Sequence, residues 1–132
     1  MKKGPKKILV IDDDPGICRM LEKRLKASHG YDVVYALDAR TGMAKAKSEK
    51  PDCIILDVMI PDMSGGEVAK VLHEDPATKD IPIVFLTVLL EQKGKKHIEL
   101  EGKVYRAIAK PYYQPELLSA LRKAMNQKDG EA

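Results

Sequence analysis

The chain has 132 residues, a length that fits one domain with its own hydrophobic core and is short for two. A hydrophobic share of 44% and a charged share of 33% are typical of a globular protein and exclude a disordered chain. No apolar run approaches the roughly 20 residues that a membrane helix needs. The basic start leads directly into a strand-length apolar run without a cleavage site, so we expect no signal peptide and a cytoplasmic protein.

The formal net charge is +3, from 23 basic and 20 acidic residues. Four lysines and no acidic residue occupy the first seven positions, so the rest of the chain holds 19 basic against 20 acidic residues. Aromatic residues make up only 5%, and Trp is absent. Direct nucleic-acid binding is therefore not expected, because it usually needs a basic face with aromatic residues that stack on bases. Cys18 and Cys53 lie inside apolar patterns and are expected to be buried free thiols.

Five short apolar runs predict strands at 8–11, 33–36, 53–56, 83–86 and 104–109. Most are continuous rather than alternating, as in the strands of a parallel sheet whose faces are both covered. Between them, apolar residues recur at helical spacing. These stripes are Ile17, Met20, Leu21 and Leu25; Ala39, Met43 and Ala46; Val68, Val71 and Leu72; and Leu117, Leu118, Leu121 and Met125.

The limits of the helices are marked in two places. Asp14-Pro15 predicts an N-cap followed by proline at the first helical position, and Gln114-Pro115 places a proline in the same way. The segment 91–100 contains Gly94 and has poor periodicity, and there we expect a short or mobile helix. The alternation of strands and helices predicts an α/β fold with a doubly wound parallel sheet. We expect this domain over 8–126, after a basic leader at 1–7 and before a polar tail at 127–132.

Polar residues follow or end four of the predicted strands. Asp12 and Asp13 follow the first strand, Asp57 follows the third, Thr87 ends the fourth, and Lys110 follows the fifth. In an open α/β sheet, sites form beyond the carboxyl ends of the strands, near the topological switch point. The sequence therefore predicts that three carboxylates, a hydroxyl and an amine meet at one edge of the sheet.

Three adjacent carboxylates about 4 Å apart repel one another by several kcal/mol in a protein-like dielectric. A raised pKa or a bound cation relieves this repulsion. Hard oxygen ligands in a small polar cleft favour Mg²⁺, which keeps several waters and usually brings a phosphate oxygen to the metal. Lys110 supplies a point charge suited to a phosphoryl oxygen, and Asp57, the deepest acid, is best placed to act as a nucleophile.

Four segments, taken together, carry a specific resemblance: LVIDDDP, IILDVMIPDMSG, IVFLT and IAKP. In this order and at these separations they resemble the receiver domains of two-component response regulators, chemotaxis receivers included, over 8–125. The resemblance implies the flavodoxin-like (βα)5 fold, with a five-stranded parallel sheet in the strand order 2-1-3-4-5. It also implies a signalling switch that takes a phosphoryl group from a sensor histidine kinase or a phosphotransfer protein.

The same resemblance implies roles for the acidic residues. Asp57 accepts the phosphoryl group, and Asp13 and the backbone carbonyl of Met59 join it in binding Mg²⁺, with Mn²⁺ as an alternative. Asp12 acts mainly through a metal-bound water. The protein is then not a classical enzyme, although it catalyses its own phosphorylation and its slow dephosphorylation at Asp57.

The family pattern also covers the other two site residues. Lys110 bridges to the phosphoryl oxygens, and Thr87 hydrogen-bonds the phosphorylated form. The Lys110-Pro111 peptide bond resembles one that is cis in the family, a geometry that is essentially confined to bonds before proline.

Several positions near the site depart from the pattern. The aromatic residue that many receivers carry three positions before the lysine is Ala107 here, and Tyr105, on the same face of the strand, is either its replacement or an ordinary half-buried strand tyrosine. Val88 is bulkier than the small residue many receivers have and is expected to narrow access to Asp57. Met59 and Leu89 occupy positions that tune loss of the phosphoryl group, and neither can hold a water by hydrogen bonding. This predicts slow self-dephosphorylation.

Receivers commonly use the first helix to meet the kinase, and the fourth helix, fifth strand and fifth helix to signal or to form a homodimer. On this second face the chain carries basic residues at Lys93, Lys95, Lys96, Lys103 and Arg106. They are consistent with a solvated surface, or with an acidic partner or dimer mate. We expect the downstream target to be a protein partner or an output domain outside this chain, with no membrane involved.

Two other functions fit parts of the pattern. Asp12-Asp13-Asp14 matches the D-x-D pattern of haloacid-dehalogenase-type phosphatases, in which Asp12 would be the nucleophile. The chain is short for that fold, and Asp57 would then lack a role. The second alternative is an interaction module that works without phosphorylation. Uptake of a phosphoryl group on Asp12 rather than Asp57 would favour the phosphatase, and failure of Mg²⁺ and a small phosphodonor to modify the chain would favour the interaction module.

Overall fold

A computed structural model describes residues 4–89 and 96–128, and residues 1–3, 90–95 and 129–132 lie outside this description. The strands are β1 Lys7–Ile11, β2 Asp32–Ala36, β3 Cys53–Leu56, β4 Ile83–Thr87, β5 His97–Leu100 and β6 Lys103–Ala109. The helices are α1 Pro15–His29, α2 Ala39–Glu49, α3 Gly65–Glu74 and α4 Gln114–Lys128. None of these helices has the length and apolar character that crossing a membrane requires.

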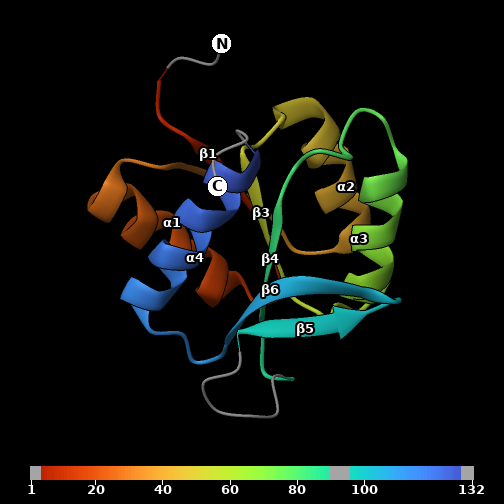
Figure 1. Ribbon diagram of the computed structural model, residues 1–132. Helices are drawn as coiled ribbons and strands as arrows, with labels where there is room; N and C mark the ends of the chain where they lie inside the picture. Colours follow the sequence, from red (N-terminus) through yellow and green to blue (C-terminus); the bar gives the residue numbers. More distant parts are fainter. Residues whose placement is uncertain (1–3, 90–95, 129–132) are drawn as a thin grey trace.

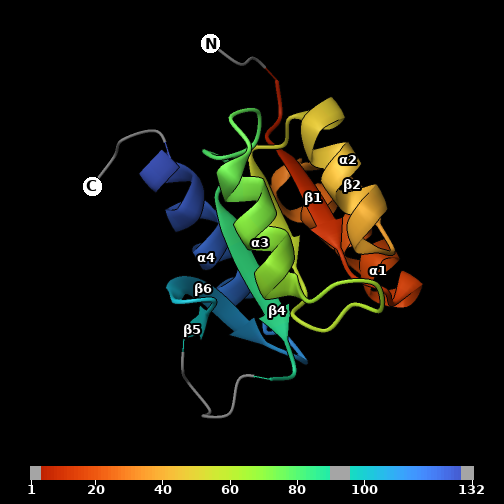
Figure 2. The ribbon, with the colours of Figure 1, turned by 90° about the vertical axis from the view of Figure 1, so that its right-hand side faces the viewer.

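The strands form one sheet in the order β2-β1-β3-β4-β6-β5. The pairings among β2, β1, β3, β4 and β6 are all parallel, and β5 pairs antiparallel with β6. Helices α1 and α4 cover one face of the sheet, and α2 and α3 cover the other (Figures 1 and 2). The doubly wound α/β fold is therefore confirmed, and the five parallel strands follow the predicted order.

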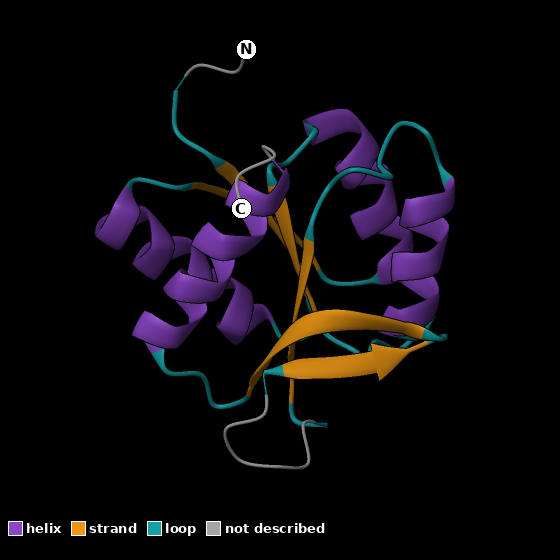
Figure 3. Cartoon of the chain, viewed as in Figure 1, coloured by secondary structure: helices purple, strands orange, loops and turns teal. Residues whose placement is uncertain are grey.

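The segment 91–100 was expected to be helical, and this expectation is wrong for its described part. His97–Leu100 forms β5, which pairs with β6 through a two-residue turn at Glu101 and Gly102 and lies at the front of the sheet in Figure 3. Both turn residues have positive φ, 53° and 77°, which suits a tight hairpin between twisted strands. Over the described residues, the sheet thus has six strands rather than five. The rest of the expected helix, including Gly94, lies outside the described residues.

The helix starts agree with the sequence. Asp14 caps α1, where its side chain accepts hydrogen bonds from the backbone N–H groups of Gly16 and Ile17, and Pro15 begins the helix. Helix α4 begins at Gln114, one residue before Pro115. Both cysteines are buried free thiols, as expected.

Two hydrophobic clusters lie on opposite faces of the sheet. Ile8 and Val10 belong to the cluster under α1 and α4, and their neighbours Leu9 and Ile11 belong to the cluster under α2 and α3. Strands β3 and β4 are buried along their whole length. Burial on both faces explains why these strands appear in the sequence as continuous apolar runs.

Candidate functional site

The site residues meet at the carboxyl edge of the parallel sheet. Ile11 pairs with Leu56, so the residues that follow β1 and β3 leave the sheet side by side. The backbone N–H of Asp57 donates to the carbonyl of Ile11 at 3.1 Å. On the other side of the site, the N–H of Lys110 donates to the carbonyl of Thr87 at 3.0 Å. Adjacent parallel strands therefore carry residues from four distant parts of the sequence to one place.

Three carboxylates form the centre of the site. Asp12, Asp13 and Asp57 each offer an oxygen atom, and these atoms lie within 4.8 Å of one another. Asp12 and Asp57 are 2% and 6% exposed, and Asp13 is exposed. Such a set of hard oxygen atoms, open to water on one side, suits a divalent cation that keeps part of its hydration shell. The described donor set therefore fits Mg²⁺.

One lysine is shared by the two buried carboxylates. Lys110 Nζ lies 2.8 Å from Asp12 Oδ2 and 2.9 Å from Asp57 Oδ2, and the side chain of Lys110 is only 13% exposed. The peptide bond between Lys110 and Pro111 is cis, as the resemblance implied. A single positive charge thus faces two buried negative charges, and the exposed Asp13 adds a third.

The pKa values of Asp12 and Lys110 are both shifted in this cluster. Burial raises the pKa of Asp12 above its ordinary value of 3.8, and the hydrogen bonds from Lys110 and from the N–H of Asp14 do not fully offset it. Burial alone would lower the pKa of Lys110, but its hydrogen bonds to Asp12 and Asp57 outweigh burial and raise it above 10.5. Cys18 lies beside this cluster, and burial raises the pKa of its thiol to about 12, so it is no nucleophile at neutral pH.

The loop after β3 orients the carboxylate of Asp57. The N–H of Met59 donates to Asp57 Oδ1 at 3.2 Å, while Lys110 holds the other oxygen. The base of the loop is closed by a 2.7 Å hydrogen bond from the N–H of Gly65 to the carbonyl of Val58. A Cβ atom at Gly65 would overlap the carbonyl oxygen of Asp57, so this position requires glycine. The role of the Met59 carbonyl as a metal ligand stays a prediction.

Thr87 lies at the end of β4 and is fully buried. Its Oγ1 accepts a hydrogen bond from the N–H of Leu89 at 3.1 Å, which ties the hydroxyl to the chain that follows the strand. Val88 and Leu89 are exposed, at 64% and 44%. Any movement of the Thr87 side chain must therefore break or carry with it the contact to Leu89.

Tyr105 is buried in the cluster under α3, on the same side of the sheet as Ala107. Its ring stacks on His73 with centroids 5.8 Å apart and meets Phe85 edge-on at 5.1 Å. Its hydroxyl lies 3.4 Å from Nδ1 of His73. This packing is that of a core side chain shared by β6, β4 and α3, and whether Tyr105 also acts as the switch aromatic stays a prediction.

Two structural features beside the site were not predicted from the sequence. Gly65 is one, and its signal was available in the glycine pair that follows Ser64. Asp62 is the other: its carboxylate accepts hydrogen bonds from the N–H groups of Ala39 and Arg40, at 2.9 and 3.1 Å. No local pattern could indicate this contact, because its partners precede it by 23 and 22 residues.

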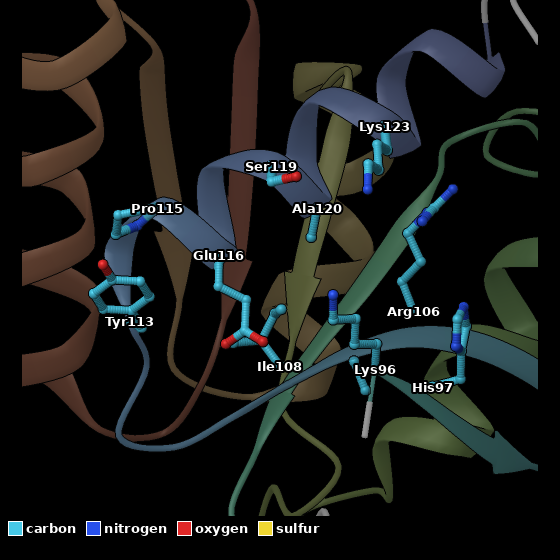
Figure 4. A pocket seen from close by; sticks show the side chains of 11 residues that line it. Lys96, His97, Arg106, Ile108, Tyr113, Pro115, Glu116, Ser119, Ala120 and Lys123 are labelled. Carbon is cyan, nitrogen blue, oxygen red and sulfur yellow. The ribbon is translucent and has the colours of Figure 1, made fainter. Parts of the chain in front are cut away.

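The expected partner face is formed by different elements from those predicted. It consists of β5, β6 and α4, because β5 replaces the described part of the expected fourth helix. A cavity of about 520 Å³ lies there, with Ala107, Ile108 and Ala120 in its lining. Figure 4 shows basic side chains around it, those of Lys96, Arg106 and Lys123. Of the five basic residues predicted on this face, Lys96, Lys103 and Arg106 are described, and Lys93 and Lys95 lie outside the described residues.

Comparison with known proteins agrees with this geometry. Residues 8–122 match the profile of the response regulator receiver domain. The response regulator PleD of Caulobacter vibrioides is 38% identical over 116 residues, which make up 88% of this chain and 25% of that protein. The alkaline phosphatase synthesis transcriptional regulatory protein PhoP of Bacillus subtilis is 40% identical over 121 residues, 91% of this chain and 48% of that protein. The chain thus spans less than half the length of these two relatives.

Solved structures show the same fold. A Vibrio cholerae chemotaxis protein is 31% identical with a TM-score of 0.78, over 92% of this chain and 99% of that one. The signal receiver domain of an HD domain-containing protein from Pseudomonas fluorescens is 25% identical with a TM-score of 0.80, over 97% of this chain and 100% of that one. The chain belongs to the response regulator receiver domain family.

Replacing Asp12 with asparagine is expected to raise the thermal stability of the metal-free protein at neutral pH. Because burial raises the pKa of Asp12, the folded state binds its proton more tightly than the unfolded state does. The contribution of Asp12 to stability is therefore full below pH 3.8 and is lost as the pH rises through the folded-state pKa. Thermal unfolding in a chelator should show the advantage of Asp12→Asn at neutral pH and its disappearance toward pH 3.8.

The matched control is Asp14→Asn, which removes the same charge from an exposed side chain and keeps a good N-cap residue. Its melting temperature should stay close to that of the wild type. If Asp12→Asn were less stable than the wild type in chelator at neutral pH, the assignment of Asp12 as a destabilising site carboxylate would be wrong.

Proposed function

We propose that the chain is a phosphorylation-activated signalling switch that accepts a phosphoryl group on Asp57 in a Mg²⁺-dependent reaction. One observation carries the proposal: Lys110 lies within 2.9 Å of both Asp12 and Asp57, in a group of three carboxylates that suits a divalent cation. A cluster of this kind lowers the stability of the folded state, because buried like charges repel one another. Its presence therefore supports a functional role. The family and the response regulators among its relatives support the same function.

The residues present can perform phosphoryl transfer. An Asp57 oxygen attacks phosphorus in line, the P–N bond of the donor phosphohistidine breaks, and the electron pair of that bond leaves with the imidazole nitrogen. Lys110 offsets charge on the equatorial oxygens, as cations do in such transition states. Asp12, Asp13, Asp57 and the Met59 carbonyl would hold Mg²⁺, which supplies further positive charge to those oxygens when bound. The product is an acyl phosphate on Asp57, and the chain is not a classical enzyme.

The switch needs more than one contact. A hydrogen bond from the Thr87 hydroxyl to the phosphoryl group is worth about 1.5–3 kcal/mol. Inverting a 1:99 equilibrium takes about 5.5 kcal/mol. Lys110 can transfer its contacts from Asp12 and Asp57 to the phosphoryl group, and movement of Thr87 would act on Leu89 through their existing hydrogen bond. We infer that Val88 and Leu89, which follow β4, carry the change.

The output partner is proposed to be acidic and to bind the face formed by β5, β6 and α4. The lining of the cavity there includes the apolar residues Ala107, Ile108 and Ala120 and the basic residues Lys96, Arg106 and Lys123. Glu116 is the acidic member of the lining. A partner segment with acidic and apolar side chains fits this composition, and a homodimer through the same face is the second occupant to test.

The phosphatase alternative receives less support from the geometry. Asp12 and Asp57 belong to the same cluster, and each accepts contacts from the Lys110 amine and from a backbone N–H. A nucleophile at Asp12 would leave Asp57 as a buried carboxylate without a role. The proposed function therefore places the nucleophile on Asp57.

The direct test is the mass of the intact protein after treatment with acetyl phosphate. The expected product carries one phosphoryl group in Mg²⁺ and none in a chelator. A chain that stays unmodified in Mg²⁺ would favour the phosphorylation-independent interaction module. A phosphoryl group found on Asp12 would favour the phosphatase.

Replacing Met59 with asparagine is expected to shorten the lifetime of the phosphorylated form about tenfold, which corresponds to about 1.4 kcal/mol of barrier. Met59 is 57% exposed at the mouth of the site, and its thioether cannot position a water as an amide can. The measurement is the decay of phosphorylated protein after removal of the phosphodonor. Met59→Leu, which keeps an apolar side chain, should decay at the wild-type rate. A wild-type lifetime of seconds would contradict the account.

A further inference from the structure

The loop between β3 and α3 carries two of the predicted metal-binding groups, Asp57 and the carbonyl of Met59. Its two ends are fixed, by the hydrogen bond between Gly65 and Val58 and by the bond from Asp57 to Ile11. The side chains of Val58 and Ile60 are each 8% exposed and pack into the core. Apolar packing of this kind sets how deep the loop lies but gives little control over the direction of its carbonyl groups.

Asp62 lies three residues after Met59 and makes the directional contact. Its two carboxylate oxygens accept separate hydrogen bonds, Oδ1 from the N–H of Ala39 at 2.9 Å and Oδ2 from the N–H of Arg40 at 3.1 Å. These backbone hydrogen bonds, first of all the one from Ala39, lower the pKa of Asp62, so the carboxylate is charged at neutral pH. A bidentate contact to two consecutive amides fixes the orientation as well as the position of the loop.

Helix α2 has a cap of its own. Asp38 accepts a hydrogen bond from the N–H of Thr41 at 2.7 Å, and its carbonyl accepts one from Gly42 at 3.0 Å. Asp62 satisfies the two remaining N–H groups of the first turn, from a distant segment of the chain. Both aspartates stabilise the same helix end, but only Asp62 belongs to the loop that carries Met59.

The outer side of this loop is open. Asp13, Met59, Pro61 and Asp62 belong to the lining of a shallow hollow of about 560 Å³ beside the carboxylate cluster. Within the described part of the chain, the hydrogen bonds that join residues 59–63 to another element are those of Asp62. The tip of the loop therefore depends on one side chain for its polar attachment.

We propose that Asp62 is a positioning residue, which fixes the loop on the amino-terminal end of α2 and so directs the Met59 carbonyl toward the metal. The inference rests on the proposed function, because the metal is part of it. Outer partners that orient metal ligands typically contribute about 10–100-fold to metal affinity. The backbone carbonyl is one ligand among several, so an effect at the lower end of this range follows.

The test compares Asp62→Ala with Asp38→Ala, which removes a cap from the same helix end without touching the loop. Mg²⁺ affinity is measured by titration calorimetry, and stability by thermal unfolding in a chelator. Both variants should melt below the wild type, because removal of a cap costs about 1 kcal/mol. Asp62→Ala should bind Mg²⁺ about tenfold more weakly, and Asp38→Ala should bind within twofold of the wild type. Asp62→Asn keeps one acceptor oxygen, so its Mg²⁺ affinity should lie between those of Asp62→Ala and Asp38→Ala.

A second measurement needs no metal. Amide hydrogen exchange over residues 58–64 should be faster in Asp62→Ala than in Asp38→Ala. If the wild type binds Mg²⁺ and the two alanine variants lose affinity equally, Asp62 is only a helix cap and the inference is overturned. If the wild type binds no Mg²⁺ at all, the proposed function and the inference both fail.

Discussion

Replacing Asp57 with alanine is expected to abolish uptake of the phosphoryl group from acetyl phosphate in Mg²⁺, while the protein stays folded. The variant loses the proposed nucleophile and one of the three carboxylates that suit the metal. It retains the ion pair between Lys110 and Asp12, now with one positive charge for one buried negative charge. The metal-free Asp57→Ala protein should therefore melt at or above the wild-type temperature.

Mass analysis of the wild type and the variant in parallel checks this expectation. The melting temperature is needed because an unfolded variant would also fail to take up a phosphoryl group. Asp13→Ala serves as a comparison: it removes an exposed carboxylate of the same cluster and should slow phosphorylation without removing the acceptor. Modification of Asp57→Ala at the wild-type level would show that the acceptor is another residue.

Replacing Lys110 with alanine is expected to destabilise the metal-free protein by about 3 kcal/mol at neutral pH. The variant leaves Asp12 and Asp57, whose side chains are 3% and 8% exposed, without their shared cation. Breaking a buried ion pair is costly because the remaining charge stays desolvated. Denaturant unfolding in a chelator measures the loss, and saturating Mg²⁺ should recover part of it through binding to the folded state.

The matched control for this variant is Lys47→Ala. Lys47 forms an ion pair of similar length with Asp75, at 2.9 Å, but its side chain is 61% exposed. Exposed ion pairs contribute about 0–1 kcal/mol, so this variant should unfold close to the wild type. Equal effects of the two lysine variants would contradict the description of Lys110 as the counterion of a buried site.

The parallel part of the fold and the centre of the site followed from local patterns in the sequence. Continuous apolar runs such as 53–56 predict buried parallel strands, and parallel strands bring their carboxyl ends to one edge. The positions of Asp12, Asp57 and Lys110 at one edge could therefore be predicted, because each residue directly follows a predicted strand. The shared face of Tyr105 and Ala107 followed from strand periodicity in the same way.

The features that the sequence did not indicate are a short strand and a contact between residues that lie far apart in the chain. Strand β5 has only four residues, its apolar positions are Ile98 and Leu100, and its turn is Glu101-Gly102 rather than the more familiar Asn-Gly or Asp-Gly. So short an alternation is hard to separate from a poor helix. Asp62 has no local signature at all, because its partners lie at the start of α2, on a different element. Its contact exists only once the fold has formed.

The central claim is that a carboxylate cluster holds Mg²⁺ and takes a phosphoryl group on one of its two buried members, Asp57. A crystal structure of the protein with Mg²⁺ and beryllofluoride, which mimics a phosphoryl group, tests it most directly. The account predicts beryllofluoride bonded to Asp57, Mg²⁺ bound by Asp13, Asp57 and the Met59 carbonyl, and Lys110 in contact with a fluoride. Beryllofluoride on Asp12, or a site that holds neither group at saturating concentrations, would contradict it.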